Sequence, residues 1–156
     1  MELSRNLRVD SVSRLLPTPA RRVEATRPVS DAVELMRKER VGCLLVTQNG
    51  KLVGIFTERD LLTRILAPGR PLTTLLSDCM TPNPVTVAPK DPVRTAVKRM
   101  QVGGYRHLPV VNGDLRPIGI LSAKRIVSYL VEHFPATVYN LPPDPENNIP
   151  SEPEGA

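Results

Sequence analysis

Val29-x-x-Ala32-Val33-x-x-Met36 returns 64 residues later as Val93-x-x-Ala96-Val97-x-x-Met100, and this repeated pattern decides the fold. The similarity continues downstream. Residues 44–46 match 108–110 at the same offset, and residues 54–57 match 119–122 at an offset of 65. An internal repeat of this length sets the architecture of a small protein. We expect the two units to pack face to face and to create pseudo-twofold clefts between them.

Length and composition limit the class of protein. A chain of 156 residues forms one compact domain or two units too small to be independent. Hydrophobic residues make up 40% of the chain, with no Trp and only five Phe plus Tyr, so we expect an aliphatic core. The chain has no run of about 18 apolar residues. Residues 1–5 also lack the apolar stretch of a secretory signal, so we expect a cytoplasmic protein that does not span a membrane.

The two cysteines fit the same compartment. Cys43 and Cys79 have neither CxxC spacing nor a nearby cluster of histidines, which argues against a metal site. We expect both to be reduced and to behave as small hydrophobic residues. A redox role or a disulfide is the alternative.

Charge is distributed unevenly along the chain. Residues 1–134 hold 21 basic and 12 acidic residues and carry +9, whereas residues 135–156 hold four acidic and no basic residues and carry −4; the two recover the overall +5. A basic body attracts nucleotides, nucleic acid or an acidic partner, and a solvated basic surface is the alternative. The opposite charges motivate the hypothesis that the acidic tail crosses onto the basic body or onto a second subunit.

The beginning of the first unit is predicted to be a helical segment, a strand and a helix. Apolar positions at helical spacing indicate a short amphipathic helical segment within residues 1–16. A short strand over 21–25 follows. Ser30 or Asp31 then caps a helix whose apolar stripe is the repeated pattern.

The remainder of the first unit is predicted to be a hairpin and a second helix. Asn49-Gly50 is a strong turn signal between strands over 43–47 and 52–56. Thr57 caps a helix over 58–66. The first unit therefore runs β-α-β-β-α, with the first helix as the crossover of a parallel pair.

The second unit repeats this order after a short helical connector over 72–77. Its predicted parts are a strand over 85–87, a helix with Asp91 as N-cap and Pro92 at the first helical position, strands over 107–111 and 116–121 around Asn112-Gly113, and a last helix capped by Ser122 that ends near Phe134.

We therefore predict an α/β fold of two β-α-β-β-α repeats with pseudo-twofold symmetry. Residues 1–70 hold the first repeat and the N-terminal helical segment, residues 71–134 the second repeat, and residues 135–156 an acidic, proline-rich tail. The tail contains six prolines and no apolar periodicity, a composition that predicts disorder.

The strongest candidate site is the strand-to-helix turn over residues 54–60. Gly54 has no side chain, so a flat ligand can approach the backbone there. Thr57 offers a hydroxyl, and free amides in the first helical turn favour a nearby anion. The Asp60 carboxylate repels phosphate but can accept both hydroxyls of a ribose diol. The alternative is a capping box, with Thr57 as N-cap and Asp60 near N3.

At this point the chain resembles a known family. Residues 79–87 (CMTPNPVTV), 105–111 (YRHLPVV) and 54–60 (GIFTERD), in order on a repeated pattern, are similar to the cystathionine-β-synthase (CBS) domain. A pair of such domains is called a Bateman module, and the resemblance covers roughly residues 8–134.

The resemblance implies a module that senses an adenosine-containing ligand: AMP, ADP or ATP, with NAD(H) or S-adenosylmethionine as further candidates. It implies that Asp60 holds the ribose and that Thr57 lies close to ribose or phosphate. The adenine would be flanked by residues 79–84 and by Tyr105 and Arg106, with Arg106 or His107 near phosphate. The ligand-binding residues implied in this way are Gly54, Thr57, Arg59, Asp60, Met80, Thr81, Pro84, Tyr105, Arg106 and His107.

The second copy departs from the family pattern. Ser122 replaces the threonine, but Arg125 stands where the pattern has Asp. A guanidinium cannot accept hydrogen bonds, so the ribose contact is lost in that cleft. Ser122, Lys124 and Arg125 at a helix N-terminus would instead form an anion site. The cleft is then empty, or it binds a phosphate-rich group or a ligand that is held differently, and we expect one adenosine site per chain.

No catalytic constellation is evident in the sequence, and no catalytic cofactor or metal is implied. We predict a regulatory module that acts on a separate protein, and the resemblance also implies a homodimer. The alternatives are a nucleic-acid-binding protein that uses the basic surface, or a structural partner with an empty cleft. Few aromatic residues are available for base stacking, which argues against the first alternative.

Overall fold

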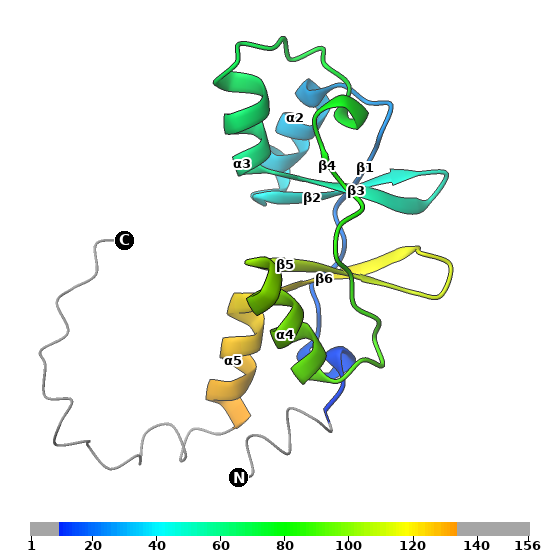
Figure 1. Cartoon of the computed structure of the whole chain (residues 1–156), viewed down its shortest axis with the longest axis vertical. Helices are drawn as coiled ribbons and strands as arrows, with labels where there is room; N and C mark the ends of the chain where they lie inside the picture. The colour runs from blue at the N-terminus through cyan, green and yellow to red at the C-terminus, as the bar shows by residue number, and fades with distance from the viewer. Residues whose placement is uncertain (1–9, 134–156) are drawn as a thin grey trace, which may run out of the picture.

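A computed structural model describes residues 10–133. Two β-sheets face each other in the middle of the molecule, and the helices cover their outer faces (Figure 1). The predicted α/β fold of two repeats is confirmed. Residues 1–9 of the predicted N-terminal segment, the end of the last helix at Phe134 and the tail over 135–156 lie outside the described residues. Of the N-terminal segment, the structure describes one short 3₁₀ helix, η1 (Val12–Leu15).

The first unit has the predicted β-α-β-β-α order. It contains β1 (Arg22–Glu24), α2 (Val29–Glu39), β2 (Cys43–Gln48), β3 (Lys51–Thr57), α3 (Glu58–Asp60) and the π-helical η2 (Leu61–Leu66). Strand β1 pairs with β2 in parallel and β2 pairs with β3 in antiparallel register, as the crossover prediction requires. A further short strand, β4 (Thr81–Pro82), joins the sheet at the other edge of β3.

The second unit keeps this order with a reduced first strand. It contains α4 (Val93–Gly103), β5 (His107–Val111), β6 (Pro117–Ser122) and α5 (Ala123–His133). The strand predicted over 85–87 is reduced to one parallel bridge between Val87 and Val110. The helical connector predicted over 72–77 begins further along the chain and is shorter; it is the 3₁₀ helix η3 (Leu76–Asp78).

Two predicted helix caps are wrong, for one physical reason. Helix α2 follows Pro28 rather than Ser30 or Asp31, and α4 follows Pro92 rather than Asp91. The first amide of each helix donates to a backbone carbonyl from a distant segment, Val29 N to Thr74 O and Val93 N to Asp10 O, both at 2.8 Å. The N-cap position of each helix is a proline, whose side chain cannot accept a hydrogen bond, so both helices begin without a side-chain cap.

The two hairpin turns use different chemistry. Asn49 and Gly50 both have positive φ (54° and 78°), the conformation that a tight two-residue turn demands, so that prediction is confirmed. The second turn is longer, and its left-handed residue is Leu115 (φ 60°). There Asn112 Oδ1 accepts hydrogen bonds from the amides of Asp114 and Arg116, each at 3.0 Å.

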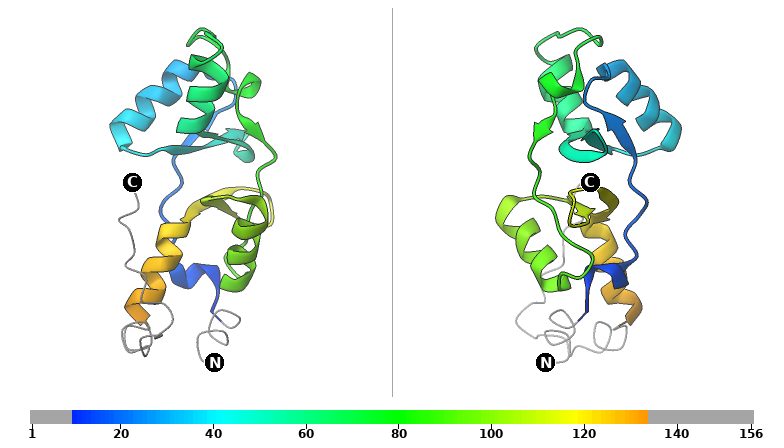
Figure 2. Two further views of the ribbon diagram at one scale, coloured as in Figure 1. Left: turned by 60° about the vertical axis from the view of Figure 1, so that its left-hand side comes forward. Right: turned by 90° about the vertical axis from the view of Figure 1, so that its right-hand side faces the viewer.

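Each unit completes the core of the other. Val12 and Leu15, which precede the first unit, are buried in the core of the second. Leu76 and Cys79, which precede the second unit, are buried in the core of the first. The two crossing segments run along opposite sides of the module (Figure 2). The division at residue 70 remains a prediction, but these contacts run across it.

The inner faces of the two sheets meet in a small apolar seam. Leu45 and Leu52 from the first unit and Val111 from the second form one buried cluster. The Leu52 amide also donates to Leu115 O across the seam at 2.9 Å. The clefts between the units therefore flank a packed centre.

Candidate functional site

The turn between β3 and α3 holds a buried carboxylate. Asp60 is 6% exposed, although it lies at the start of a surface helix. Thr57 Oγ1 accepts from the Asp60 amide (3.2 Å), and Asp60 Oδ2 accepts from the Thr57 amide (3.0 Å). The capping box that the sequence offered as an alternative is therefore present.

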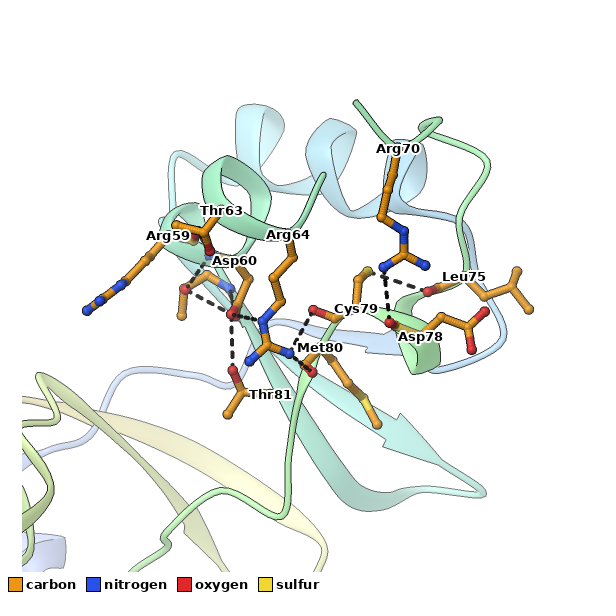
Figure 3. A network of polar contacts seen from close by, with 11 residues as sticks. Arg59, Asp60, Thr63, Arg64, Arg70, Leu75, Asp78, Cys79, Met80 and Thr81 are labelled. Atoms are coloured by element: carbon orange, nitrogen blue, oxygen red, sulfur yellow. Dashed lines mark hydrogen bonds and ion pairs between the residues drawn. The ribbon is translucent and has the colours of Figure 1, made fainter. Parts of the chain in front are cut away.

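The capping box uses Oδ2 of Asp60 and does not account for the contacts of Oδ1. Asp60 Oδ1 accepts from the Thr81 hydroxyl at 3.0 Å, and Arg64 Nε lies 3.4 Å from the same oxygen. The Arg64 guanidinium also donates to Met80 O at 2.7 Å, so it joins the carboxylate to the segment that leads into the second unit (Figure 3). Arg64 was missed by the sequence analysis. Its signal is the i,i+4 spacing from Asp60, which is typical of an ion pair on a helix.

The expectation of free amides at this turn is wrong. The amides of Thr57 and Asp60 are held by the capping box, and the Glu58 amide donates to Gly42 O at 3.0 Å. These protein partners leave little donor capacity for an anion beside α3.

Gly54 is required for packing within the protein. Its neighbour across the sheet is Pro82, and a Cβ added at Gly54 would overlap the Met80 sulfur and lie 3.0 Å from Thr81 O. The missing side chain thus lets β4 approach β3. The Met80 side chain occupies this space in the structure, and its use by a flat ligand stays a prediction.

The other predicted residues lie at the start of β5, on α3 or in the segment that joins the two units. Tyr105 and Arg106 precede β5 and are exposed, and His107 is the first residue of that strand, paired with Ser122. Partial burial, and secondarily the Arg106 charge, lower the pKa of His107, so its neutral form is favoured. Arg59 extends away from Asp60 in Figure 3, and Pro84 is partly buried.

An apolar pocket of about 450 Å³ lies beside Tyr105. Its lining includes Val85, Val102, Gly103 and Tyr105, with the basic α4 residues Lys98 and Arg99. Of these, only Tyr105 was a predicted site residue. Val102 is 79% exposed, and an apolar residue at the end of a helix, three residues before an aromatic one, is the signal that could have identified the pocket.

A second cleft of about 230 Å³ lies between the units and includes Thr18, Arg21, Gly42, Cys43, His107 and Ser122 in its lining. Ser122 caps α5 as predicted, because its Oγ accepts from the Arg125 amide at 3.0 Å. The Arg125 side chain donates from Nε to Leu15 O at 2.8 Å. Neither Lys124 nor Arg125 lines the cleft, and an anion site formed with them stays a prediction.

The two cysteines are free and buried. Burial, and to a smaller extent the Asp60 charge, raise the pKa of Cys43 to about 12. Burial also raises the pKa of Cys79. Both shifts favour the protonated thiol, which is the less reactive form of cysteine.

Residues 10–133 contain neither a cluster of metal ligands nor a helix that could span a membrane. Among these residues, no three His, Cys, Asp or Glu side chains gather where they could hold a metal ion. No helix in the same range has the length and apolar character needed to cross a bilayer.

Comparison with known proteins agrees with this geometry. The model of the CBS domain matches the chain twice, over residues 12–67 and 76–132. CBS domain-containing protein CBSCBSPB3 of Arabidopsis thaliana is 39% identical over 108 residues, which cover 67% of this chain and 19% of that protein. CBS domain-containing protein CBSX3, mitochondrial, of the same organism is 38% identical over 112 residues, which cover 67% of this chain and 54% of that protein. The chain thus spans about a fifth of one relative and about half of the other.

A solved structure shows the same arrangement. CBS domain protein PAE2072 from Pyrobaculum aerophilum, complexed with AMP, superimposes with a TM-score of 0.71 at 28% sequence identity. The match covers 79% of this chain and 97% of that one, so it includes both units.

Proposed function

This chain belongs to the CBS domain family, and on that premise we propose that it is a regulatory module that binds an adenosine-containing ligand between its two units. AMP, ADP and ATP are the leading candidates, with NAD(H) and S-adenosylmethionine as alternatives. The observation that carries the proposal is the carboxylate of Asp60, which is 6% exposed and faces the segment that joins the units. The similar PAE2072 is complexed with AMP, which supports this class of ligand.

Asp60 would hold the ribose. A carboxylate accepts two hydroxyl donors at once, which suits the vicinal diol of a ribose. The capping function of Asp60 uses Oδ2, whereas Oδ1 faces Thr81 on β4. We therefore assign the diol to the Oδ1 side of the carboxylate.

The apolar pocket beside Tyr105 would hold the adenine. Thr81 contacts Asp60, and Val85, which lines the pocket, follows four residues later. Four extended residues span at most roughly 14 Å, so the carboxylate and the pocket lie within reach of one nucleotide. Val85 and Val102 offer apolar surface, and the Tyr105 ring offers a stacking face.

Arg106 would bind the phosphate. The lowered pKa of His107 favours its neutral form at physiological pH, so His107 supplies a hydrogen bond rather than a charge. Arg106 is exposed, and the fork of donors on its guanidinium suits a phosphate group. Thr57, Arg59, Met80 and Pro84 remain proposed contacts around this core of the site.

We propose a homodimer because both units expose the same apolar pair. Leu62 and Leu66 (59% and 57% exposed) correspond at an offset of 65 to Val127 and Val131 (59% and 38% exposed). Their helices, α3 with η2 and α5, lie on one side of the module in Figure 1. A second copy related by a twofold axis could cover both pairs at once. Sedimentation of wild type and of the double variant Leu62→Glu/Val127→Glu tests this, and a monomeric wild type would overturn it.

The dimer would act on a separate, regulated protein. Ligand would bias the relative orientation of the two units, and it can shift a partner only through different affinities for the two states. We place the protein in the cytosol, since free cysteines suit a reducing compartment. A fluorescent fusion tests that placement, with mitochondria as the competing result.

Calorimetric titration with AMP, ADP, ATP, NAD(H) and S-adenosylmethionine tests the proposed function. A true ligand at about 100 times its Kd also stabilises the fold by about 2.7 kcal/mol in a thermal melt. Asp60→Asn should weaken binding strongly, and 2′-deoxy-AMP should bind the wild type more weakly than AMP. The control is Asp31→Asn, an exposed carboxylate on α2 that pairs with Arg27. Full binding by Asp60→Asn would contradict the ribose assignment.

A further inference from the structure

The Asp60 carboxylate is fully occupied by protein donors. Oδ2 accepts from the Thr57 amide (3.0 Å) and the Thr57 hydroxyl (3.2 Å), and Oδ1 receives the Thr81 hydroxyl (3.0 Å) and Arg64 Nε (3.4 Å). A carboxylate has about four acceptor positions. A ribose diol at Asp60 must therefore displace donors that are already bound.

The four donors are not equally easy to displace. The two from Thr57 belong to the capping box and are fixed by the turn itself. Of the two donors on Oδ1, Thr81 belongs to the segment between the units and Arg64 holds that segment in place. Thr81 lies on β4, and Arg64 donates to Met80 O (2.7 Å) and lies within hydrogen-bond distance of Cys79 O (3.5 Å) (Figure 3).

The segment itself is weakly attached to the first sheet. Strand β4 pairs with β3 through only two residue pairs, and one further backbone hydrogen bond joins the Asn83 amide to Val53 O at 3.1 Å. Beyond Asn83 the chain leads through Val85 to the second unit. The side-chain contacts of Thr81 and Arg64 thus form a substantial part of what holds this segment in place.

We propose that the Thr81 hydroxyl, supported by Arg64, is an internal competitor for the ribose subsite on Asp60. Ligand binds by exchanging the Thr81 O–H at Oδ1 for a ribose O–H, and the exchange releases β4 from the carboxylate. The proposal rests on the proposed function, and it gives that function a physical link between the site and the segment that joins the units. Apparent affinity is reduced by the fraction of molecules in which the competitor is bound.

Thr81→Val tests the competitor directly. Valine keeps the shape and the β-branching of threonine but has no hydroxyl, so it frees one acceptor position on Oδ1. We expect AMP to bind this variant about tenfold more tightly, the equivalent of one charge-assisted hydrogen bond. If Thr81 instead donated to the ligand, the same variant would bind AMP more weakly. Weaker or unchanged binding therefore overturns the proposal.

Hydrogen exchange without ligand provides the second measurement. With its Asp60 contact removed, β4 should open more often, and the Asn83 amide should exchange about tenfold faster than in wild type. Unchanged exchange overturns the proposal even where AMP binds neither protein, a result that would separately remove the proposed function. The matched control is Thr63→Val, because the Thr63 hydroxyl donates to Arg59 O rather than to Asp60. It should leave both AMP affinity and Asn83 exchange at wild-type values.

Discussion

Arg125 donates its Nε to the carbonyl oxygen of Leu15 at 2.8 Å, across 110 positions of the chain. Leu15 corresponds at the repeat offset of 64 to Cys79, whose carbonyl oxygen lies 3.5 Å from Arg64 in the other unit. The second unit thus keeps an arginine that holds the entering segment, although it has lost the carboxylate. Arg125 stands at the position of Asp60 in the repeat and has a structural role there, because it holds the segment at Leu15.

From this contact we predict that Arg125→Met destabilises the protein without affecting AMP binding. One hydrogen bond to a charged donor is lost, so the free energy of unfolding should fall by about 1.5 kcal/mol. Urea denaturation measures this loss, and calorimetry measures AMP affinity and stoichiometry. A fall in AMP affinity comparable to that of Asp60→Asn would show that the second cleft takes part in binding.

Gly54→Ala should destabilise the first unit because the space for a Cβ is filled. The added carbon would overlap the Met80 sulfur and crowd Thr81 O, and overpacking of this kind costs about 1–3 kcal/mol. Urea denaturation tests the prediction. Gly113→Ala is the control, since a Cβ there meets no atom within 4 Å. Partial rescue by Met80→Ala would identify the Met80 side chain as the obstacle.

Leu15→Ala and Leu76→Ala should each destabilise the whole module by about 3 kcal/mol. Both side chains are at most 1% exposed. Leu15 precedes the first unit but lies in the core of the second, and Leu76 precedes the second unit but lies in the core of the first. Denaturation should remain a single transition, because neither core is complete without the other segment. Leu72→Ala, at a position that is 46% exposed, should change stability little. Two separate transitions would contradict the finding that each unit completes the core of the other.

Stability should rise as pH increases through the titration range of His107. Its pKa is lowered from 6.5 in the folded protein, so between that lowered value and 6.5 the unfolded chain binds more protons. The free energy of unfolding therefore increases with pH in this window, and the gain is complete above 6.5. Thermal melts across the window should show this rise in wild type and in His133→Gln but not in His107→Gln.

Neither cysteine should react with a thiol reagent in the folded protein. Burial and Asp60 raise the pKa of Cys43 to about 12, and Cys79 is 2% exposed. Reaction with a chromogenic disulfide should be slow in buffer and complete in urea. Thr73→Cys, at an exposed position, should add one thiol that reacts at once. Fast labelling of two thiols in wild type would show that the first core opens readily.

The repeat predicted the fold because it reports which faces are buried. The residues of the pattern Val29-x-x-Ala32-Val33-x-x-Met36 lie in or against one core, and Asn49-Gly50 forms the turn that its type requires. The caps were misplaced because each helix begins directly after a proline, where the amides of Val29 and Val93 donate to carbonyls far away in the sequence. A local pattern cannot report a distant carbonyl.

The site was predictable where a motif marks it and not elsewhere. Thr57 and Asp60 stand out through their spacing, and their capping box follows from it. The contact of Asp60 with Thr81 depends on the pairing of β3 with β4. That pairing consists of two residue pairs, and no periodic pattern in the sequence predicts it. The i,i+4 spacing of Arg64 from Asp60 indicates an ion pair, but it does not show that the guanidinium also holds the segment at Met80.

Because the segment before each unit is buried in the core of the other unit, a cut between the units should leave two incomplete cores. A break after Gly69, in the exposed turn beyond η2, would leave Leu15 on one fragment and Leu76 on the other. Each fragment would then carry a piece of the core that the opposite fragment lacks. The two halves should fold together when mixed and fail when alone, so this small protein behaves as a pair of complementary fragments that happen to share one backbone.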